Sequence, residues 1–182
     1  MLSGGGAARF GGADKASIEL AGETLLERAL GALGEIADVV VVGEEVPTSR
    51  PVTFLREDPP GGGPAAGLLA GLAGFPHPPR LVVVLAVDMP LVTVATVQRL
   101  VLAAEYDGSL LVDAGGRRQY LCAAYRTEAL LASAPETSRQ HGLPVRRLVG
   151  DLRLAEVPAL EGEAQDVDTW DDLRALRSRL DG

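Results

Sequence analysis

Short apolar runs alternate along this chain with stretches of helical period. Five runs are candidate strands, and turns rich in Pro and Gly lie between the first two and after the third: 39–42, 52–55, 81–87, 109–112 and 120–125. A strand that is apolar on both faces needs cover on both, which is typical of a parallel sheet between helices. The alternation predicts an α/β fold, a Rossmann-like open and mostly parallel sheet with helices on both faces.

Apolar periodicity predicts helices over 24–34, 65–73, 93–104 and 169–180. Thr24 and Glu27 have the spacing of a capping box at the start of the first helix. Neither an internal repeat nor a low-complexity linker interrupts the pattern. We therefore expect a single domain over residues 1–182.

Composition limits the classes of function. A net charge of −8 and a pI near 4.8 argue against binding to a nucleic-acid backbone, which needs clustered cations. The longest apolar run, 81–87, is too short to span a membrane, and no signal peptide is evident. Cys122 is the only cysteine, which excludes an internal disulfide framework. We expect a cytoplasmic protein without nucleic-acid or membrane partners, as a monomer or weak oligomer.

Lys15 is the only lysine of the chain and ends a glycine-rich run that begins at Leu2. The other sixteen basic residues are arginine, and a compact ammonium fits a cramped phosphate site where a guanidinium does not. Glycines at 4–6 allow backbone N–H groups to approach an anion closely. Together with Arg9, the run predicts a triphosphate site, although it matches neither the Walker nor the Rossmann fingerprint. A plain surface loop is the alternative.

Only Met1 and Leu2 precede this glycine run. If the loop follows a strand, that strand is either short or has residues upstream that this sequence lacks. We expect a short first strand that anchors the loop weakly, which would reduce activity.

Asp88 directly follows the longest apolar run and precedes Met89 and Pro90. The carboxyl end of a buried parallel strand is the ligand-binding edge of an open α/β sheet. A carboxylate there suits Mg²⁺, which proteins hold by one or two carboxylates plus substrate phosphates. A turn or capping aspartate is the alternative.

A second acidic group occupies 166–172. Thr169 and Asp172 have capping-box spacing, and Asp171 adds to the acids of a first helical turn. Asp166 and Asp168 alternate ahead of the helix, so one or both could complete a metal site with Asp88, and Asp168 is favoured.

A third group, 56–67, joins a strand end to a helix start. Gly63 and Gly67 permit close approach of a ligand, and Asp58 is a candidate contact to a base or ribose. A proline-stiffened connection is the alternative. Gln119 and Tyr120 are candidate contacts to a second substrate, although a strand aromatic explains Tyr120 equally. His77 and His141 lack partners for a hydrolase triad or a zinc site.

Together these motifs resemble those of the molybdenum cofactor guanylyltransferases, single-domain α/β proteins of the nucleotidyltransferase superfamily with the nucleotide-diphospho-sugar transferase fold. The matching segments are Leu2–Gly5, Arg9–Gly11, Asp14–Lys15, Gly63–Gly67, Asp88–Pro90 and Asp166–Thr169. Three features depart from the pattern: Ser3 replaces an alanine, Gly43 stands where relatives often carry asparagine, and aspartates replace two late asparagines.

The resemblance implies transfer of GMP from GTP to the phosphate of molybdenum-bound molybdopterin, with Mg²⁺ as cofactor and pyrophosphate released. It implies catalytic roles for Arg9, Lys15 and Asp88, and Mg²⁺ ligands at Asp88 and Asp168. The residues implied to bind GTP are Leu2, Ser3, Gly4, Gly5, Lys15, Gly43, Asp58, Gly63 and Asp88.

Three alternatives remain open at this point. The chain could be a cytidylyltransferase for the same cofactor, or a nucleotidyltransferase with another phosphorylated acceptor. It could also be an accessory protein that binds GTP without catalysis.

Overall fold

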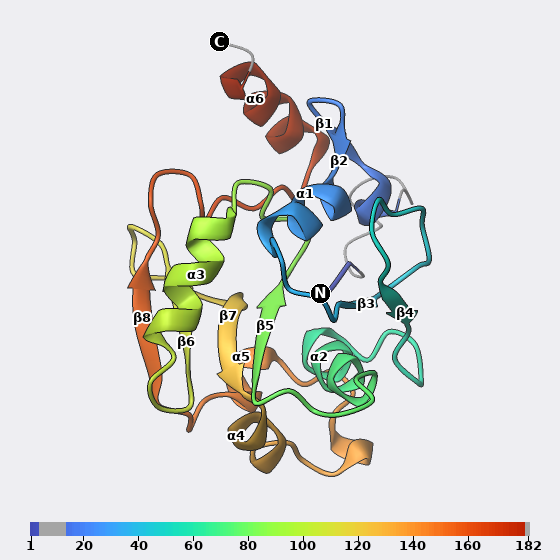
Figure 1. The fold of residues 1–182 in the computed structure, drawn as a ribbon, viewed down its shortest axis with the longest axis vertical. Coiled ribbons are helices and arrows are strands. Elements are labelled where there is room, and N and C mark those ends of the chain that lie inside the picture. The colour runs from blue at the N-terminus through green and yellow to red at the C-terminus, as the bar shows by residue number, and fades with distance from the viewer. Residues whose placement is uncertain (4–13, 181–182) are drawn as a thin grey trace.

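The computed structural model describes residues 1–3 and 14–180 (Figure 1). The first elements are η2 (Lys15–Ser17), β1 (Glu19–Leu20), β2 (Glu23–Thr24), α1 (Leu25–Ala32), β3 (Val40–Val42), β4 (Thr53–Leu55), α2 (Pro64–Ala73) and β5 (Leu81–Leu85). They are followed by α3 (Val94–Ala103), β6 (Gly108–Val112), β7 (Arg118–Arg126), α4 (Thr127–Ala132), η3 (Thr137–Arg139), α5 (Val145–Leu148), β8 (Leu154–Pro158) and α6 (Trp170–Leu180).

Two paired sets of strands form a mixed sheet, and β1 and β2 form a separate antiparallel pair. β3 pairs with β4 in parallel, and β5, β7, β6 and β8 follow one another in a four-stranded set. Leu2 bridges the two sets, because it pairs in parallel with both Val42 and Ala86. β7 runs antiparallel to β5 and β6, whereas β6 and β8 are parallel. The predicted mostly parallel α/β fold is confirmed, with β7 as its antiparallel strand.

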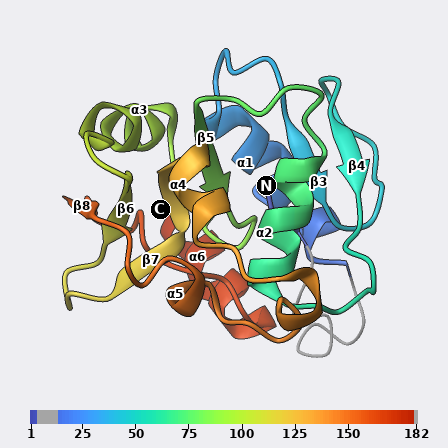
Figure 2. The same cartoon turned by 90° about the horizontal axis from the view of Figure 1, so that it is seen from below.

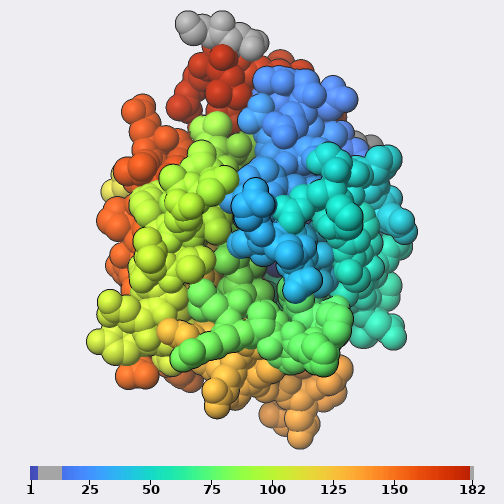
Figure 3. All heavy atoms as spheres, viewed as in Figure 1, coloured from blue at the N-terminus to red at the C-terminus, as the bar shows by residue number. Residues whose placement is uncertain are grey.

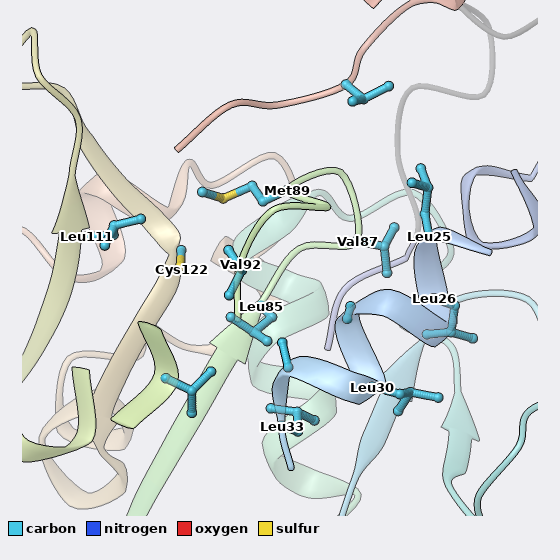
Figure 4. Packing of buried hydrophobic residues seen from close by; sticks show 14 of the residues in the cluster. Leu25, Leu26, Leu30, Leu33, Leu85, Val87, Met89, Val92, Leu111 and Cys122 are labelled. Carbon is cyan, nitrogen blue, oxygen red and sulfur yellow. The ribbon is translucent and has the colours of Figure 1, made fainter. Parts of the chain in front are cut away.

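Helices lie on both faces of the sheet (Figure 2). One apolar cluster combines α1, α3 and α6 with residues of the sheet, including the leucines of α1 and Leu85, Val87 and Cys122 (Figure 4). A second cluster on the other face combines α2, α4 and α5. In the space-filling view, α1 and α3 cover the same face side by side (Figure 3). This double cover explains why the central strands are apolar on both sides.

The helix starts follow from their capping residues. Thr24 Oγ1 accepts a hydrogen bond from the Glu27 N–H at 3.1 Å, as the sequence predicts. The Glu27 carboxylate does not complete the capping box and instead accepts a bond from the Ser49 N–H at 2.7 Å. Thr93 and Thr96 form a complete capping box at the start of α3. These caps set the positions of α1 and α3 over the sheet.

Residues 1–3 lie between β3 and β5, where Leu2 forms a parallel bridge to each side. The Leu2 N–H donates to the Leu85 carbonyl at 2.9 Å, and the Val42 N–H donates to the Met1 carbonyl at 2.9 Å. The Met1 ammonium donates to the Val40 carbonyl at 2.6 Å, and burial lowers its pKa to about 5. Backbone pairing thus holds residues 1–3 between β3 and β5.

Several elements lie outside the predicted set. They are the β1–β2 hairpin, the short helices α4 and α5, the single turns η2 and η3, and the edge strand β8. Among the described residues, no helix combines the length and apolarity needed to cross a bilayer.

Candidate active site

Lys15 binds two carboxylates from distant parts of the chain. Its Nζ donates to Asp88 Oδ2 at 3.1 Å and to Asp168 Oδ1 at 2.9 Å. The Lys15 side chain is only 6% exposed, whereas the Asp88 and Asp168 side chains are 29% and 40% exposed. A buried cation therefore joins two partly accessible carboxylates.

Local structure places each of the three groups. Lys15 begins η2, where the Asp14 carboxylate accepts a hydrogen bond from the Ala16 N–H at 3.3 Å. Asp88 follows β5, and its carbonyl accepts a bond from the Val167 N–H at 2.8 Å. That bond brings the segment with Asp168 to the carboxyl end of β5, the edge at which open α/β sheets bind ligands.

Asp168 is held from the other side by the start of α6. Its N–H donates to Asp172 Oδ2 at 3.1 Å, and the Thr169 N–H donates to the same oxygen at 2.8 Å. The Asp172 N–H in turn donates to Thr169 Oγ1 at 3.2 Å. Bonds from Thr169 and from the Asp168 backbone lower the pKa of Asp172, so this cap remains ionised.

The electrostatic balance keeps Lys15 charged. Burial alone would lower the pKa of Lys15, but Asp88 and Asp168 together raise it above the ordinary value. At neutral pH the site thus holds an ammonium group beside two carboxylates, an arrangement suited to phosphates and to a divalent cation.

A cavity of about 880 Å³ opens beside these carboxylates. Asp88, Asp166 and Asp168 line it, and so does Gly63 at the start of α2. Arg117 and Arg146 also line it, and neither forms an ion pair with a described residue. The pocket can therefore offer two exposed guanidinium groups to an anionic ligand.

Arg118 and Gln119 border the same cavity with Tyr120. Arg118 Nε donates to Glu156 at 2.8 Å, so its charge is already paired within the sheet. Tyr120 is half-buried, and its carbonyl accepts a bond from the Tyr125 hydroxyl at 2.8 Å. The predicted second-substrate contacts thus lie where such a substrate could reach them, and their role stays a prediction.

The remaining predicted nucleotide residues lie outside this lining. Leu2 and buried Ser3 lie between β3 and β5, where the Ser3 N–H donates to the Val42 carbonyl at 3.1 Å. Gly43 follows β3, and Asp58 is exposed in the loop before α2. Gly4, Gly5 and Arg9 lie outside the described residues.

Residues 142–146 contribute a wall of the cavity that sequence reasoning did not predict. The Gly142 N–H donates to the Gly62 carbonyl at 2.8 Å, which brings α5 and Arg146 to the cavity. Nothing in the spacing of these residues marks them as part of a site, because their place depends on a contact between two loops far apart in the sequence.

Mg²⁺ fits the donor set only in combination with a phosphate ligand. Among the described residues, no group of three histidine, cysteine or acidic side chains could hold a metal ion. Asp88 and Asp168 supply two carboxylates, the number with which proteins hold Mg²⁺ when phosphates supply other ligands. Their shared contact with the Lys15 ammonium shows that both already converge on one cation.

Cys122 and the histidines add no reactive group to this pocket. Cys122 is fully buried, and burial raises the pKa of its thiol to about 12, which keeps it protonated. Cys122 therefore packs as an apolar side chain of the core.

Comparison with curated proteins narrows the choice of family for this chain. The chain is 39% identical over 132 residues to the probable molybdenum cofactor guanylyltransferase of Mycobacterium bovis strain BCG / Pasteur 1173P2. The probable molybdenum cofactor guanylyltransferase of Mycobacterium ulcerans strain Agy99 is 37% identical over the same length. Each match covers 68% of this chain and 65% of the relative, so the chain spans just under two thirds of these relatives.

Solved structures support the fold. Molybdopterin-guanine dinucleotide biosynthesis protein A from Archaeoglobus fulgidus superposes with a TM-score of 0.72 at 22% identity, covering 99% of this chain and 96% of that one. For 2-C-methyl-D-erythritol 4-phosphate cytidylyltransferase from Thermus thermophilus, the TM-score is 0.73 at 20% identity, covering 100% and 97%. The model of the MobA-like NTP transferase domain matches residues 1–157, and the chain belongs to this family.

Proposed function

We propose that this protein is a nucleotidyltransferase that transfers GMP from GTP to the terminal phosphate of molybdenum-bound molybdopterin. The observation that carries the proposal is the convergence of Lys15, Asp88 and Asp168 at the carboxyl edge of the sheet, beside the 880 Å³ cavity. The family match and the names of the curated relatives support this choice of reaction.

In this reaction an ionised phosphate oxygen of the acceptor attacks the α-phosphorus of GTP. A new P–O bond forms as the bond to the β-phosphate oxygen breaks, and pyrophosphate leaves with the electron pair. Because the attacking phosphate is already ionised, no general base is required. The task of the protein is to align the two substrates and to stabilise the growing negative charge.

The chain's own residues divide that task by position. Lys15 and Arg9 would neutralise the triphosphate, and Asp88 with Asp168 would hold Mg²⁺. When bound there, the ion would stabilise charge on the α-phosphate and on the departing pyrophosphate. Backbone groups of Leu2, Ser3, Gly4 and Gly5, with Gly43, Asp58 and Gly63, remain our candidates for contacts to the nucleotide.

We propose Arg117 and Arg146 as the contacts to the acceptor. Both line the cavity and are exposed, so a phosphorylated, anionic acceptor would find two positive groups in the cavity that Asp88 also lines. A guanidinium group binds two phosphate oxygens through two parallel N–H donors. Such a contact would orient the attacking phosphate and also neutralise part of its negative charge.

Calorimetric titration with GTP, CTP and ATP, each with and without Mg²⁺, tests the nucleotide. We expect selective binding of GTP that Mg²⁺ strengthens, followed by pyrophosphate release when the acceptor is added. Tighter binding of CTP would replace the proposal by a cytidylyltransferase. GTP binding without pyrophosphate release in the presence of acceptor would indicate an accessory protein.

Asp88→Asn tests the metal role without removing the side chain. We expect the fold to persist and Mg²⁺-dependent turnover to fall by about 10²-fold or more, since one carboxylate charge is lost. Normal turnover with an unchanged Mg²⁺ requirement would show that the ion is held elsewhere.

A further inference from the structure

The Lys15 ammonium is the counter-ion of two carboxylates that belong to distant segments. Its Nζ lies 3.1 Å from Asp88 Oδ2 and 2.9 Å from Asp168 Oδ1. Because both oxygens are within hydrogen-bond distance of the same nitrogen, the two carboxylates are close enough to share one small cation. Lys15 thus compensates the repulsion between two negative groups at the carboxyl edge of the sheet.

A divalent cation would need these same two carboxylates. The Lys15 side chain is only 6% exposed, so little water lies around its charge to screen it. An ammonium and a divalent cation held by one pair of carboxylates therefore repel each other strongly. The two cations compete for Asp88 and Asp168.

The backbone of Lys15 is held in place, whereas its stem can rotate. The Asp14 carboxylate accepts a hydrogen bond from the Ala16 N–H at 3.3 Å, and the Lys15 carbonyl accepts one from the Ile18 N–H at 3.3 Å. These bonds fix η2 but do not restrain the four-carbon stem, which ends in a compact group with rotatable donors. The ammonium can change partners without a change in the turn that carries it.

A triphosphate would offer that ammonium a stronger partner. The carboxylates of Asp88 and Asp168 are 29% and 40% exposed, and both line the 880 Å³ cavity, so a ligand there can reach the whole cluster. A triphosphate carries more negative charge than two carboxylates and arrives with a divalent cation of its own. Once Lys15 turns to the phosphate oxygens, the two carboxylates need a new cation.

We propose, on the basis of the Mg²⁺ role proposed above, that the Lys15 ammonium is an internal substitute for the divalent cation. It holds Asp88 and Asp168 together until a triphosphate draws it away. The two carboxylates then accept a divalent cation only together with the nucleotide. Lys15 thereby sets the order of binding in addition to neutralising phosphate charge.

Titration with Mn²⁺ in the absence of nucleotide tests this substitution. Mn²⁺ prefers oxygen ligands, as Mg²⁺ does, and the electron paramagnetic resonance signal of the free ion reports how much is bound. Lys15→Met keeps an apolar stem and removes the charge. We expect this variant to bind Mn²⁺ roughly 10-fold or more tighter than the parent chain, because its two carboxylates lack a counter-ion. Asp88→Asn, added to Lys15→Met, should abolish the gain.

Arg117→Met is the matched control for the lost charge. Arg117 lines the same cavity but is not the cation that holds Asp88 and Asp168. We expect its removal to leave the Mn²⁺ affinity within about two-fold of the parent value. An equal gain in Arg117→Met and Lys15→Met would overturn the proposal, since any positive charge would then serve. Equal Mn²⁺ affinity of Lys15→Met and the parent, or no binding by either, would overturn it as well.

A second measurement uses the parent chain and needs no substitution. Lys15 is the only lysine, so protein grown with isotope-labelled lysine gives a single lysine side-chain signal in nuclear magnetic resonance. Mg²⁺ alone, at millimolar concentration, should leave this signal in place, and Mg²⁺ with GTP should shift it. A shift on Mg²⁺ alone, or none once GTP and Mg²⁺ are bound, would contradict the exchange of partners.

Both measurements are separate from the test of the reaction. Neither requires the acceptor or turnover, and the Mn²⁺ titration requires no nucleotide. A chain that fails to transfer GMP can therefore still show the substitution by Lys15. Conversely, GMP transfer by a parent chain that binds Mn²⁺ as tightly as Lys15→Met would leave the proposed function intact and remove this proposal alone.

Discussion

Two clusters of opposite charges each join distant parts of this chain, and they differ in what surrounds them. The open cluster consists of Lys15, Asp88 and Asp168. Its cation is buried, but its carboxylates are 29% and 40% exposed beside the large cavity. An approaching ligand can therefore compete for both partners of the ammonium.

The closed cluster consists of Thr96, Arg99 and Glu163, where Glu163 is 7% exposed. Glu163 accepts bonds from Thr96 Oγ1 at 2.6 Å and from the Leu160 N–H at 2.7 Å, and it forms an ion pair with Arg99. Arg99 Nη1 also donates to the Pro158 carbonyl at 2.9 Å. These bonds tie α3 to the segment after β8 and give both oxygens of the Glu163 carboxylate hydrogen-bond partners.

The difference separates a binding arrangement from a structural one. A buried carboxylate with all its oxygens satisfied holds elements together, and removing a partner costs stability. A charged group that faces a cavity contributes less to stability and can exchange partners with a ligand. The comparison predicts that the open cluster controls activity and the closed cluster controls folding.

Lys15→Ala should have the largest effect. We expect GMP transfer to fall by about 10²- to 10³-fold, because the only lysine ammonium near the triphosphate is lost. The free energy of unfolding should change by no more than about 1–2 kcal/mol, as expected of a partly exposed cluster. Transfer assays and denaturant unfolding measure the two quantities on one preparation.

Lys15→Arg is the matched control for that variant. It keeps the charge but replaces a compact ammonium by a planar fork in a site with 6% exposure. We expect little recovery of activity. Full activity in this variant would remove the argument from the single lysine, and unchanged GTP affinity in Lys15→Ala would remove the phosphate role.

Glu163→Gln should produce the reverse pattern. It preserves shape while removing the charge that Arg99, Thr96 and the Leu160 N–H all contact, so we expect a loss of about 2–3 kcal/mol in the free energy of unfolding. GTP affinity, measured below the unfolding transition, should stay within about two-fold of the parent chain. Thr96→Val is a milder control, expected to lose about 1 kcal/mol.

The two clusters should lose their contributions to stability at opposite ends of the pH range, the closed cluster in acid and the open cluster in alkali. Burial alone would raise the pKa of Glu163, but bonds from Thr96, Leu160 and Arg99 hold it below the ordinary value of 4.5. Its contribution is therefore present above pH 4.5 and is lost as the pH falls through the folded pKa. The raised pKa of Lys15 gives a contribution present below pH 10.5 and lost as the pH rises further.

The free energy of unfolding of each single variant, measured by denaturant titration across the pH range, tests this separation. Glu163→Gln should flatten the acid limb of stability and leave the alkaline limb intact, and Lys15→Ala should do the opposite. Identical profiles for both variants would contradict the division into two independent clusters.

The sequence predicted the parts of the molecule that depend on local pattern. All five candidate strands and all four candidate helices exist, because their apolar periodicity reports the faces that the fold buries. The direction of β7 was beyond such reasoning, since a strand reads the same in either direction. β8 was missed because it is an edge strand in which exposed Glu156 and Pro158 flank buried Val157.

The residues of the site likewise fall into those that the sequence indicated and those that it did not. Asp88 could be located because a carboxylate after a buried strand lies at the ligand-binding edge, and Lys15 because it is the single lysine. The closed cluster gave no signal, since Arg99 and Glu163 have ordinary surroundings in the sequence. Arg146 was missed because only the contact between Gly62 and Gly142 brings it to the cavity.

Thr169→Ala should have the smallest effect and tests where the open cluster ends. Thr169 Oγ1 both accepts the Asp172 N–H at 3.2 Å and donates to Asp172 Oδ2 at 2.8 Å, so it holds the carboxylate that binds the Asp168 N–H. We expect a loss of about 1 kcal/mol in the free energy of unfolding, typical of a lost helix cap. Because Asp168 would be less firmly placed, the Mg²⁺ concentration for half-maximal transfer should rise a few-fold while the maximal rate changes little.

Thr24→Ala removes an equivalent cap on α1, away from the cavity, and should cost similar stability without changing the Mg²⁺ requirement. If both variants shift that requirement equally, the cap of α6 serves only the helix, and the open cluster ends at Asp168.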